Sequence, residues 1–201
     1  MANTKSKESM IVDVQPLRTA EEIADFRESL QIAGKRSGQS DRNLLLFNIG
    51  INTGLRIGDI VKLRIEDVKG KTSVIIREGK TSKPRTVHLT AIMADIADYL
   101  TDKQAEVPNG APTWLFPSRK GDNHITTTQA YRVLTKAADL IGRSDIGTHT
   151  LRKTFGYHYY QRTKDVATLM EIFNHSDQVT TKRYIGIRDQ EIADSLKDFR
   201  L

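Results

Sequence analysis

Two β-rich runs lie close together in a chain whose other apolar residues recur mostly at helical spacing. The runs, at 73–77 (SVIIR) and 86–89 (TVHL), flank the polar segment GKTSKP. Such runs around a turn-forming segment predict a hairpin with an extended basic tip. Because helical patterns lie on both sides of this hairpin, we expect an α+β fold that is mainly α-helical, with a small antiparallel β-sheet.

The first helix is predicted from its start signal. Thr19 is placed to cap the backbone while the side chain of Glu22 reaches back, which forms a capping box. Phe26 and Leu30 follow at helical spacing, and Gly34 marks an end. Further helices are predicted at about 41–54, 57–63, 91–104, 127–141 and 187–201, with three or four short ones from Thr150 onward.

The 201 residues suffice for one good-sized domain, which we place at 16–201 after a flexible leader at 1–15. No apolar run approaches the roughly 20 residues that cross a bilayer, and the start lacks the apolar segment of a secretory signal. We therefore expect no membrane contact and a cytoplasmic location.

Cysteine is absent, which excludes disulfides and thiolate zinc sites. A net charge of +6 and a pI of about 9.5 favour a polyanionic partner, although many proteins are mildly basic.

Phosphate-directed side chains concentrate in four places. In the first, TGLRIGD, a helix is expected to end, the chain turns at Gly54, and Arg56 stands at the start of the next helix. An arginine there can present its planar fork to a phosphate. The alternative is a surface arginine paired with Asp59 or Glu66.

The second place is the hairpin tip, which carries Lys80, Lys83 and Arg85. A basic hairpin suits insertion at a DNA groove, and a lysine held against a phosphate can act as a general acid. The alternative is that these cations only discourage edge-to-edge aggregation of the strands.

The third and fourth places follow each other toward the C-terminus. In HTLRK, His149 and Arg152 are three residues apart and share a helix face, so that one exchanges protons while the other holds charge. Alternatively, His149 only caps a helix.

In the fourth place, NHSD and TKRY, Ser176 is a candidate cap for the helix that delivers Tyr184. A tyrosine hydroxyl can attack phosphorus when cations stabilise its phenolate, although most tyrosines are core or surface residues.

In this order the motifs resemble the tyrosine recombinase or phage integrase family. The matching motifs are TGLRIGDIVKL, a lysine in a basic hairpin, HTLR, NHS and an RY near the C-terminus. The resemblance spans about residues 40–186. Each motif alone is weak, whereas five in this order and spacing are highly specific. The resemblance implies the catalytic-domain fold of that family.

Carried over residue by residue, the resemblance assigns the chemistry of strand cleavage. It implies that Arg56 and Arg152 clamp the scissile phosphate. It implies that Tyr184 forms a 3′-phosphotyrosine and that Lys80 protonates the departing 5′-oxygen.

The resemblance also assigns supporting roles. It implies that His149 assists proton transfer as a base for the nucleophile and that His175 hydrogen-bonds a non-bridging oxygen. Asp59 occupies the family's acidic position, where a structural role is expected. The candidate DNA contacts are Lys83, Arg85, Lys153, Lys182 and Arg183.

Cationic side chains replace a metal ion in this scheme. Two guanidiniums and an imidazole supply the charge that a metal supplies elsewhere, and the sequence has no acidic cluster at metal-ligand spacing. A phosphotyrosine preserves the energy of the broken bond, and the sequence has no phosphate-cradling P-loop. We therefore expect no metal, no cofactor and no use of ATP.

The sequence departs from the family's pattern at several points. Phe173-Asn174 precedes His175 where the family usually has Leu-Gly, and VHL follows the hairpin where the family often has VPL. The family's N-terminal core-binding domain, which clamps DNA, is not seen. We therefore expect either an excised catalytic domain or a naturally minimal enzyme. The helix at about 187–201 is amphipathic and is expected either to pass to a neighbouring subunit or to fold back in cis.

The resemblance implies a site-specific recombinase that acts on double-stranded DNA. Its expected role is the integration or excision of a phage or other mobile element. The expected assembly is a homo-oligomer, a tetramer on nucleoid DNA, helped by DNA-bending accessory proteins. A type IB topoisomerase shares the chemistry and is the nearest alternative, followed by a DNA-binding regulator without catalysis. A metal hydrolase is disfavoured because the histidines lack ligand partners at metal-site spacing.

Overall fold

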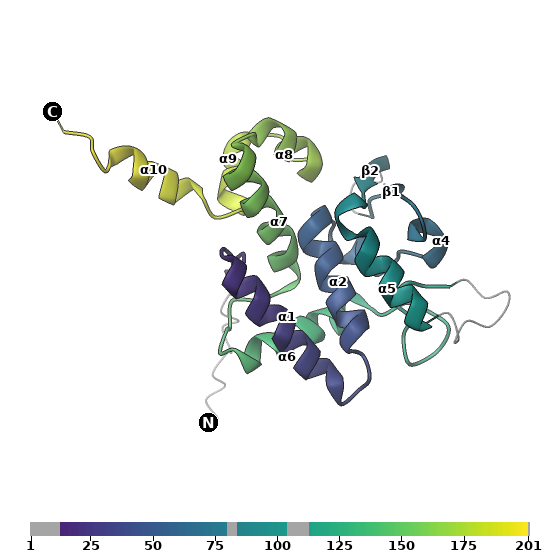
Figure 1. The fold of residues 1–201 in the computed structure, drawn as a ribbon. Helices are drawn as coiled ribbons and strands as arrows, with labels where there is room; N and C mark the ends of the chain where they lie inside the picture. Colours follow the sequence, from purple (N-terminus) through teal and green to yellow (C-terminus); the bar gives the residue numbers. More distant parts are fainter. Residues whose placement is uncertain (1–12, 80–83, 104–112, 201) are drawn as a thin grey trace, which may run out of the picture.

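A computed structural model of the chain describes residues 13–79, 84–103 and 113–200. These residues form a mainly helical fold with a two-stranded antiparallel sheet, which confirms the predicted fold class (Figure 1). The elements are α1 (Ala20–Lys35), α2 (Ser40–Thr53), α3 (Ile57–Ile60), α4 (Ile65–Val68), β1 (Ser73–Arg77), β2 (Pro84–His88), η1 (Thr90–Ile92), α5 (Met93–Lys103), α6 (Thr127–Leu140), α7 (Thr148–Thr163), α8 (Val166–Phe173), α9 (Gln178–Tyr184) and α10 (Arg188–Leu196).

Local signals in the sequence explain where several helices begin. The Thr19 hydroxyl accepts a hydrogen bond from the Glu22 N–H at 3.0 Å, and the Glu22 carboxylate accepts one from the Thr19 N–H at 3.1 Å. The predicted capping box at the start of α1 is therefore confirmed. The helix predicted at 57–63 begins at Ile57 as expected, but it ends three residues early, at Ile60, and a separate helix, α4, begins at Ile65. The Asp67 carboxylate accepts from the Arg64 N–H at 2.8 Å, which satisfies the backbone at the start of α4.

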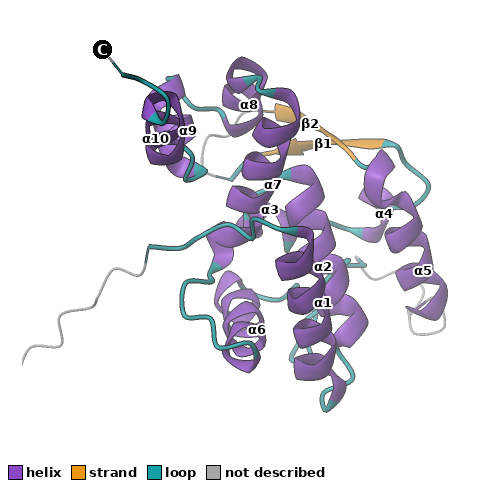
Figure 2. Cartoon of the chain, turned by 60° about the vertical axis from the view of Figure 1, so that its left-hand side comes forward, coloured by secondary structure: helices purple, strands orange, loops and turns teal. Residues whose placement is uncertain are grey.

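The hairpin packs one face against the helices. Val74 and Val87 are paired across the strands and are both buried, whereas the neighbouring Ile75 is 73% exposed. The alternation follows from the two-residue period of a strand. The sheet lies at the edge of the helical body (Figure 2).

Two hydrophobic cores of different size support the fold. The larger core contains side chains from helices α1 through α6 and from the sheet. It also includes Leu151 of α7. The smaller core consists of α7, α8 and the segment around α9. Its buried members are Tyr160, Leu169, Phe173, Ile185 and Ile187. Helix α7 takes part in both cores and therefore connects them.

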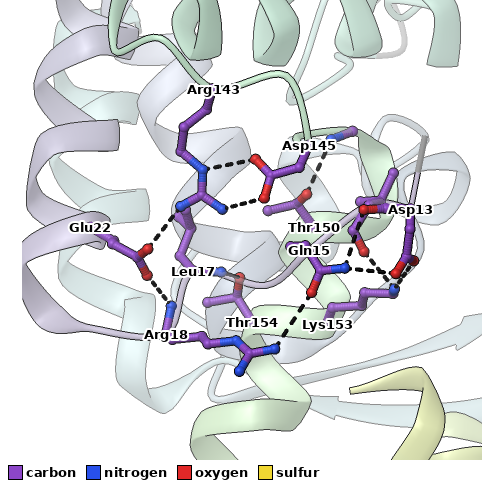
Figure 3. Close-up of polar contacts among 12 residues, drawn as sticks. Asp13, Gln15, Leu17, Arg18, Glu22, Arg143, Asp145, Thr150, Lys153 and Thr154 are labelled. Atoms are coloured by element: carbon purple, nitrogen blue, oxygen red, sulfur yellow. Dashed lines mark hydrogen bonds and ion pairs between the residues drawn. The ribbon is translucent and has the colours of Figure 1, made fainter. Parts of the chain in front are cut away.

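The segment before α1 crosses α7 and is held by polar contacts (Figure 3). The Leu17 N–H donates to the Thr154 hydroxyl at 2.9 Å, and the Gln15 N–H donates to the Asp145 carbonyl at 2.9 Å. Arg143 in turn forms ion pairs with Asp145 and Glu22. Residues 13–15 of the predicted leader thus lie against the body, and residues 1–12 lie outside the described residues.

The N-terminal segment packs against the body, whereas the C-terminal helix α10 projects away from it (Figure 1). Its apolar residues Ile192 and Leu196 are about half exposed, and Phe199 beyond it is 66% exposed. Across the described ranges, no helix is long and apolar enough to span a bilayer.

Candidate active site

The turn between α2 and α3 places the first arginine. Helix α2 ends at Gly54, whose φ of +63° lies in the left-handed region. A Cβ at this position would lie 2.5 Å from the ring of Phe155, so glycine is required both for the turn and for the close approach. The turn leads directly to Arg56, which precedes α3 and whose side chain is 22% exposed.

Arg56 does not pair with either acid that its sequence neighbourhood suggests. Its Nη1 atom lies 2.6 Å from Oε2 of Glu78, the residue that follows β1. Asp59 instead accepts a hydrogen bond from the Gly79 N–H at 2.9 Å, and Glu66 pairs with Arg64. The alternative of a surface pairing with Asp59 or Glu66 is therefore wrong. The contacts of Arg56 with Glu78 and of Asp59 with Gly79 therefore join the start of α3 to the two residues that follow β1.

The second arginine is fixed by the backbone. Arg152 on α7 is 2% exposed, and it donates to the carbonyls of Gly54 at 2.5 Å and Phe173 at 2.9 Å. Its guanidinium also lies over the Phe173 ring, 4.3 Å from the centroid. Burial lowers the Arg152 pKa to about 10, so the side chain keeps its charge at neutral pH. Arg152 thus links the α2–α3 turn to the end of α8.

The tyrosine that the motifs single out faces the histidine of the third motif. Tyr184 is the last residue of α9, and its Oη atom lies 3.1 Å from Nδ1 of His149. The Tyr184 ring meets the rings of Phe173 and His175 edge-on, with centroids 5.5 and 5.3 Å apart. The cap of α9 is Asp177, whose carboxylate accepts from the Thr180 N–H at 2.7 Å. The expected cap at Ser176 is therefore wrong by one residue.

The surroundings of Tyr184 oppose its ionisation. Burial raises the pKa of the Tyr184 hydroxyl, and the nearby charges of Arg152 and Arg56 act in the opposite direction. Because burial dominates, the hydroxyl stays protonated near neutral pH. A nucleophilic tyrosine at this position therefore needs a base within hydrogen-bond distance, and His149 occupies that place.

His175 is held by the helix that carries the tyrosine. Its Nδ1 atom lies 3.1 Å from the hydroxyl of the buried Thr181 on α9. The preceding Asn174 has a φ of +51°, and the His175 N–H donates to the Met170 carbonyl. This is the left-handed end of a helix, which glycine usually provides and asparagine tolerates. Asn174 therefore supplies the left-handed residue at the end of α8, where the family's usual pattern has glycine.

Arg56, His149 and Arg152 line a cavity of about 420 Å³, and Tyr184 and His175 are not among its lining residues. Its wall includes Arg56, Asp59, Lys62, Gly79, His149 and Arg152. Lys62 and Glu78 were not identified from the sequence. Lys62 lies in the turn after α3, so its spacing of three residues from Asp59 gave no helical signal. Glu78 directly precedes the basic tip, and an acid next to several cations is a pairing signal.

The predicted DNA contacts have different surroundings. Lys80, a predicted catalytic residue, and Lys83 lie outside the described residues. Arg85 is directed inward, since its Nη2 atom donates to the Thr53 carbonyl at 2.9 Å. Lys153 donates to the Val14 carbonyl at 2.5 Å. The last two contacts lie on α9: Lys182 pairs with Glu191 at 2.7 Å, and Arg183 is exposed. Their roles at DNA stay predictions.

Within residues 13–79, 84–103 and 113–200, no three His, Asp or Glu side chains gather where they could hold a metal ion. The arrangement instead brings together the Tyr184 hydroxyl, an imidazole and two guanidiniums. These groups can activate an alcohol and stabilise the added charge on a phosphate.

Comparison with other proteins identifies relatives over most of the chain. The probable integrase/recombinase YoeC of Bacillus subtilis (strain 168) is 41% identical over 187 residues, which cover 92% of this chain and 97% of that protein. The tyrosine recombinase XerD of Caulobacter vibrioides is 28% identical over 166 residues, 80% of this chain and 54% of that protein.

Solved structures show the same architecture. The XerH site-specific recombinase, bound to palindromic difH substrate in a post-cleavage complex, aligns with a TM-score of 0.71 at 25% identity. The alignment covers 90% of this chain and 51% of XerH. The XerA recombinase aligns with a TM-score of 0.68 at 21% identity, covering 93% and 67% of the two chains. The chain therefore spans nearly all of YoeC but about half of the XerD and XerH chains.

The fold and the arrangement of the tyrosine, imidazole and arginines define a tyrosine recombinase catalytic domain. Residues 19–191 match the phage integrase family over most of the chain, and the relatives are named integrases and tyrosine recombinases. The chain belongs to the phage integrase family.

Proposed function

We propose that the protein cleaves and rejoins DNA strands at specific sites through a covalent bond between Tyr184 and a 3′-phosphate. The observation that carries this proposal is the contact of 3.1 Å between Tyr184 Oη and His149 Nδ1, beside the cavity that Arg56 and Arg152 line. A hydroxyl next to a base and two fixed cations suits in-line attack on a phosphodiester.

The proposed cleavage step keeps atoms and charge in balance. The Tyr184 oxygen attacks phosphorus, and its proton passes to the unprotonated Nδ1 of His149. The bond from phosphorus to the 5′-oxygen breaks, and that oxygen takes a proton from Lys80. Arg56 and Arg152 stabilise the negative charge that grows on the phosphate. Rejoining reverses these transfers with the 5′-hydroxyl of another strand, so the step consumes no ATP.

Double-stranded DNA is the proposed substrate. The net charge of +6 supports binding to phosphates, and the XerH structure contains its difH substrate. We assign the reaction to the integration or excision of a phage or other mobile element on nucleoid DNA, because the chain belongs to the phage integrase family. A tetramer on DNA and DNA-bending accessory proteins complete this proposal.

The C-terminal helix is the proposed contact between subunits. Helix α10 is held at its base, where Glu191 pairs with Lys182 at 2.7 Å and accepts a hydrogen bond from Tyr160. Beyond Glu191, its apolar residues are exposed and the helix projects from the body (Figure 1). Exposed apolar side chains on one helix favour burial against a second copy. Deletion of residues 188–201 should abolish synapsis of two duplexes, and unchanged synapsis would exclude the exchange.

Covalent capture tests the central proposal. The protein is incubated in EDTA with a pool of nicked suicide duplexes whose core is randomised, and adducts that survive detergent are isolated and sequenced. Adducts formed by the wild type and absent from Tyr184→Phe would support the proposal. DNA binding without any adduct would overturn it in favour of a regulator. Addition of a second duplex then separates strand exchange from the resealing expected of a topoisomerase.

A further inference from the structure

Glu78 is a buried carboxylate that the cleavage scheme leaves without a role. It is 3% exposed and follows β1 directly, next to the basic tip of the hairpin. Its Oε2 atom lies 2.6 Å from Arg56 Nη1, and its Oε1 atom lies 3.6 Å from Arg85 Nη1. Burying a charge is costly unless partners compensate it, so two arginines around one carboxylate indicate a built arrangement.

The hydrogen bond from Arg56 to Glu78 fixes the orientation of the Arg56 guanidinium but engages only some of its N–H donors. A guanidinium has five N–H donors in one plane, and the hydrogen bond to Glu78 engages the Nη1 group. The remaining donors stay available for a phosphate in the cavity that Arg56 lines. A flexible side chain that is already fixed loses less entropy when it binds, and it meets the phosphate in a defined orientation.

Arg85 connects this ion pair to the second arginine of the site. Its side chain is 17% exposed, and its Nη2 atom donates to the Thr53 carbonyl at 2.9 Å. The carbonyl of the next residue, Gly54, accepts from Arg152 Nη1 at 2.5 Å. Two adjacent carbonyls at the end of α2 therefore hold Arg85 and Arg152. An ion pair at 3.6 Å between Glu78 and Arg85 completes a series of contacts that runs from Arg56 to this turn and on to Arg152.

We propose that Glu78 and Arg85 are positioning residues that set the spacing of the two phosphate-binding arginines. Glu78 orients Arg56, and Arg85 compensates the charge of Glu78 while tying it to the turn that holds Arg152. Arg85 then acts through the protein interior and not as a DNA contact.

The proposal predicts opposite effects on rate and on affinity. Glu78 places a negative charge beside the cavity, so removing it makes the cavity more attractive to DNA. The same change releases Arg56 from its fixed orientation. Because a misplacement of about 1 Å in a catalytic group costs on the order of 10²-fold in rate, cleavage by Glu78→Gln should slow roughly 10- to 100-fold while DNA affinity is unchanged or higher. A residue needed only for folding would lower both.

The first part of the test needs no reaction. Guanidinium NMR spectra of the full chain without DNA are compared for the wild type, Glu78→Gln and Glu78→Asp, and Arg56→Lys and Arg85→Lys assign the two signals. Restricted Arg56 and Arg85 signals in the wild type that become mobile in Glu78→Gln support the proposal. Unrestricted signals in the wild type overturn it, whatever the protein does to DNA.

The second part rests on the proposed function and uses a suicide duplex obtained by covalent capture. Single-turnover cleavage and DNA affinity are measured for Glu78→Gln, for Glu78→Asp, which keeps the charge but shortens its reach, and for Glu66→Gln as the matched control on the exposed face of α4. Slow cleavage with undiminished affinity in either Glu78 variant supports the proposal. Wild-type rates in both overturn it and leave the recombinase function intact. If the wild type forms no adduct, the proposed function fails and the NMR spectra alone decide the role of Glu78.

Discussion

The larger and the smaller hydrophobic cores support different halves of the active site. The larger core includes fully buried residues such as Phe47 and Ile60, and it holds the turn and helix that place Arg56. The smaller core has five buried members and carries Tyr184 at its edge. Arg56, a proposed phosphate-binding residue, therefore stands on extensive packing, whereas Tyr184, the proposed nucleophile, stands on a small cluster.

This difference has a physical consequence. A segment with few buried apolar contacts opens at a lower free energy than a segment in the main core. The nucleophile helix is thus the part of the site that is easier to displace, and α7 is the element that couples it to the rest. Variants on α7 can test this division, because its residues face one core or the other.

Arg152→Ala breaks the link between the two cores and should have the largest effect. The substitution removes a phosphate-binding cation, and it leaves the buried Gly54 and Phe173 carbonyls without their donor. Cleavage should fall on the order of 10³-fold. The free energy of unfolding should fall by about 1–3 kcal/mol, because buried acceptors lose a partner. Adduct formation and chemical denaturation measure the two effects.

A matched control is available on the same helix. Arg162 lies at the exposed end of α7, so Arg162→Ala should change neither quantity. Equal losses in the two variants would show that general charge, and not the placement of Arg152, supports cleavage.

His149→Gln tests the side of the site that acts on the nucleophile. Glutamine keeps a polar group near Tyr184 but cannot accept the proton at neutral pH. The rate of adduct formation should fall on the order of 10²-fold, as for loss of a general base, with little change in stability because His149 is exposed. An unchanged rate would remove His149 from the proton transfer.

The sequence was sufficient for the features that depend on neighbours along the chain. The capping box of Thr19 and Glu22 and the hairpin are confirmed, and the order of the motifs led to the correct family. Such features are encoded within a few residues by hydrogen-bonding groups and apolar spacing.

Features that depend on the meeting of distant segments were not predicted. The ion pair of Arg56 and Glu78 joins residues 22 positions apart, and it exists because the hairpin folds back onto α3. The inward direction of Arg85 follows from the same packing, since only the fold brings the Thr53 carbonyl within reach. The division into two cores also has no local signal, because a single helix, α7, supplies Leu151 to one core and Tyr160 to the other.

Two glycines, one on α7 and one on α2, sharpen the comparison of the cores. A Cβ at Gly156 on α7 would lie 2.6 Å from Ile185 and 2.7 Å from Phe173, in the smaller core. A Cβ at Gly50 on α2 would lie 2.6 Å from the Leu151 side chain, in the larger core. Each overpacked variant should lose about 1–3 kcal/mol of stability.

The two variants should differ in their effect on cleavage. Gly156→Ala should displace α9 and slow cleavage about 10-fold at a temperature where both proteins are folded, since small misplacements of a nucleophile are costly. Gly50→Ala should slow cleavage less. Thermal denaturation and single-turnover rates measured on both proteins check this. Equal rates at equal stability would mean that the smaller core does not control the position of Tyr184.

The ionisation of Tyr184 gives the smallest but most direct test of its surroundings. Burial raises the Tyr184 pKa above its ordinary value of 10.0, so the folded state holds this proton more tightly than the unfolded state. The resulting stability is present below pH 10 and is lost as the pH rises through the folded pKa. The difference in phenolate absorbance between the wild type and Tyr184→Phe should therefore show one step above pH 10. In Arg152→Gln this step should move higher, because Arg152 is the largest influence that favours the phenolate. A step below pH 10 would mean that the cations outweigh burial at Tyr184.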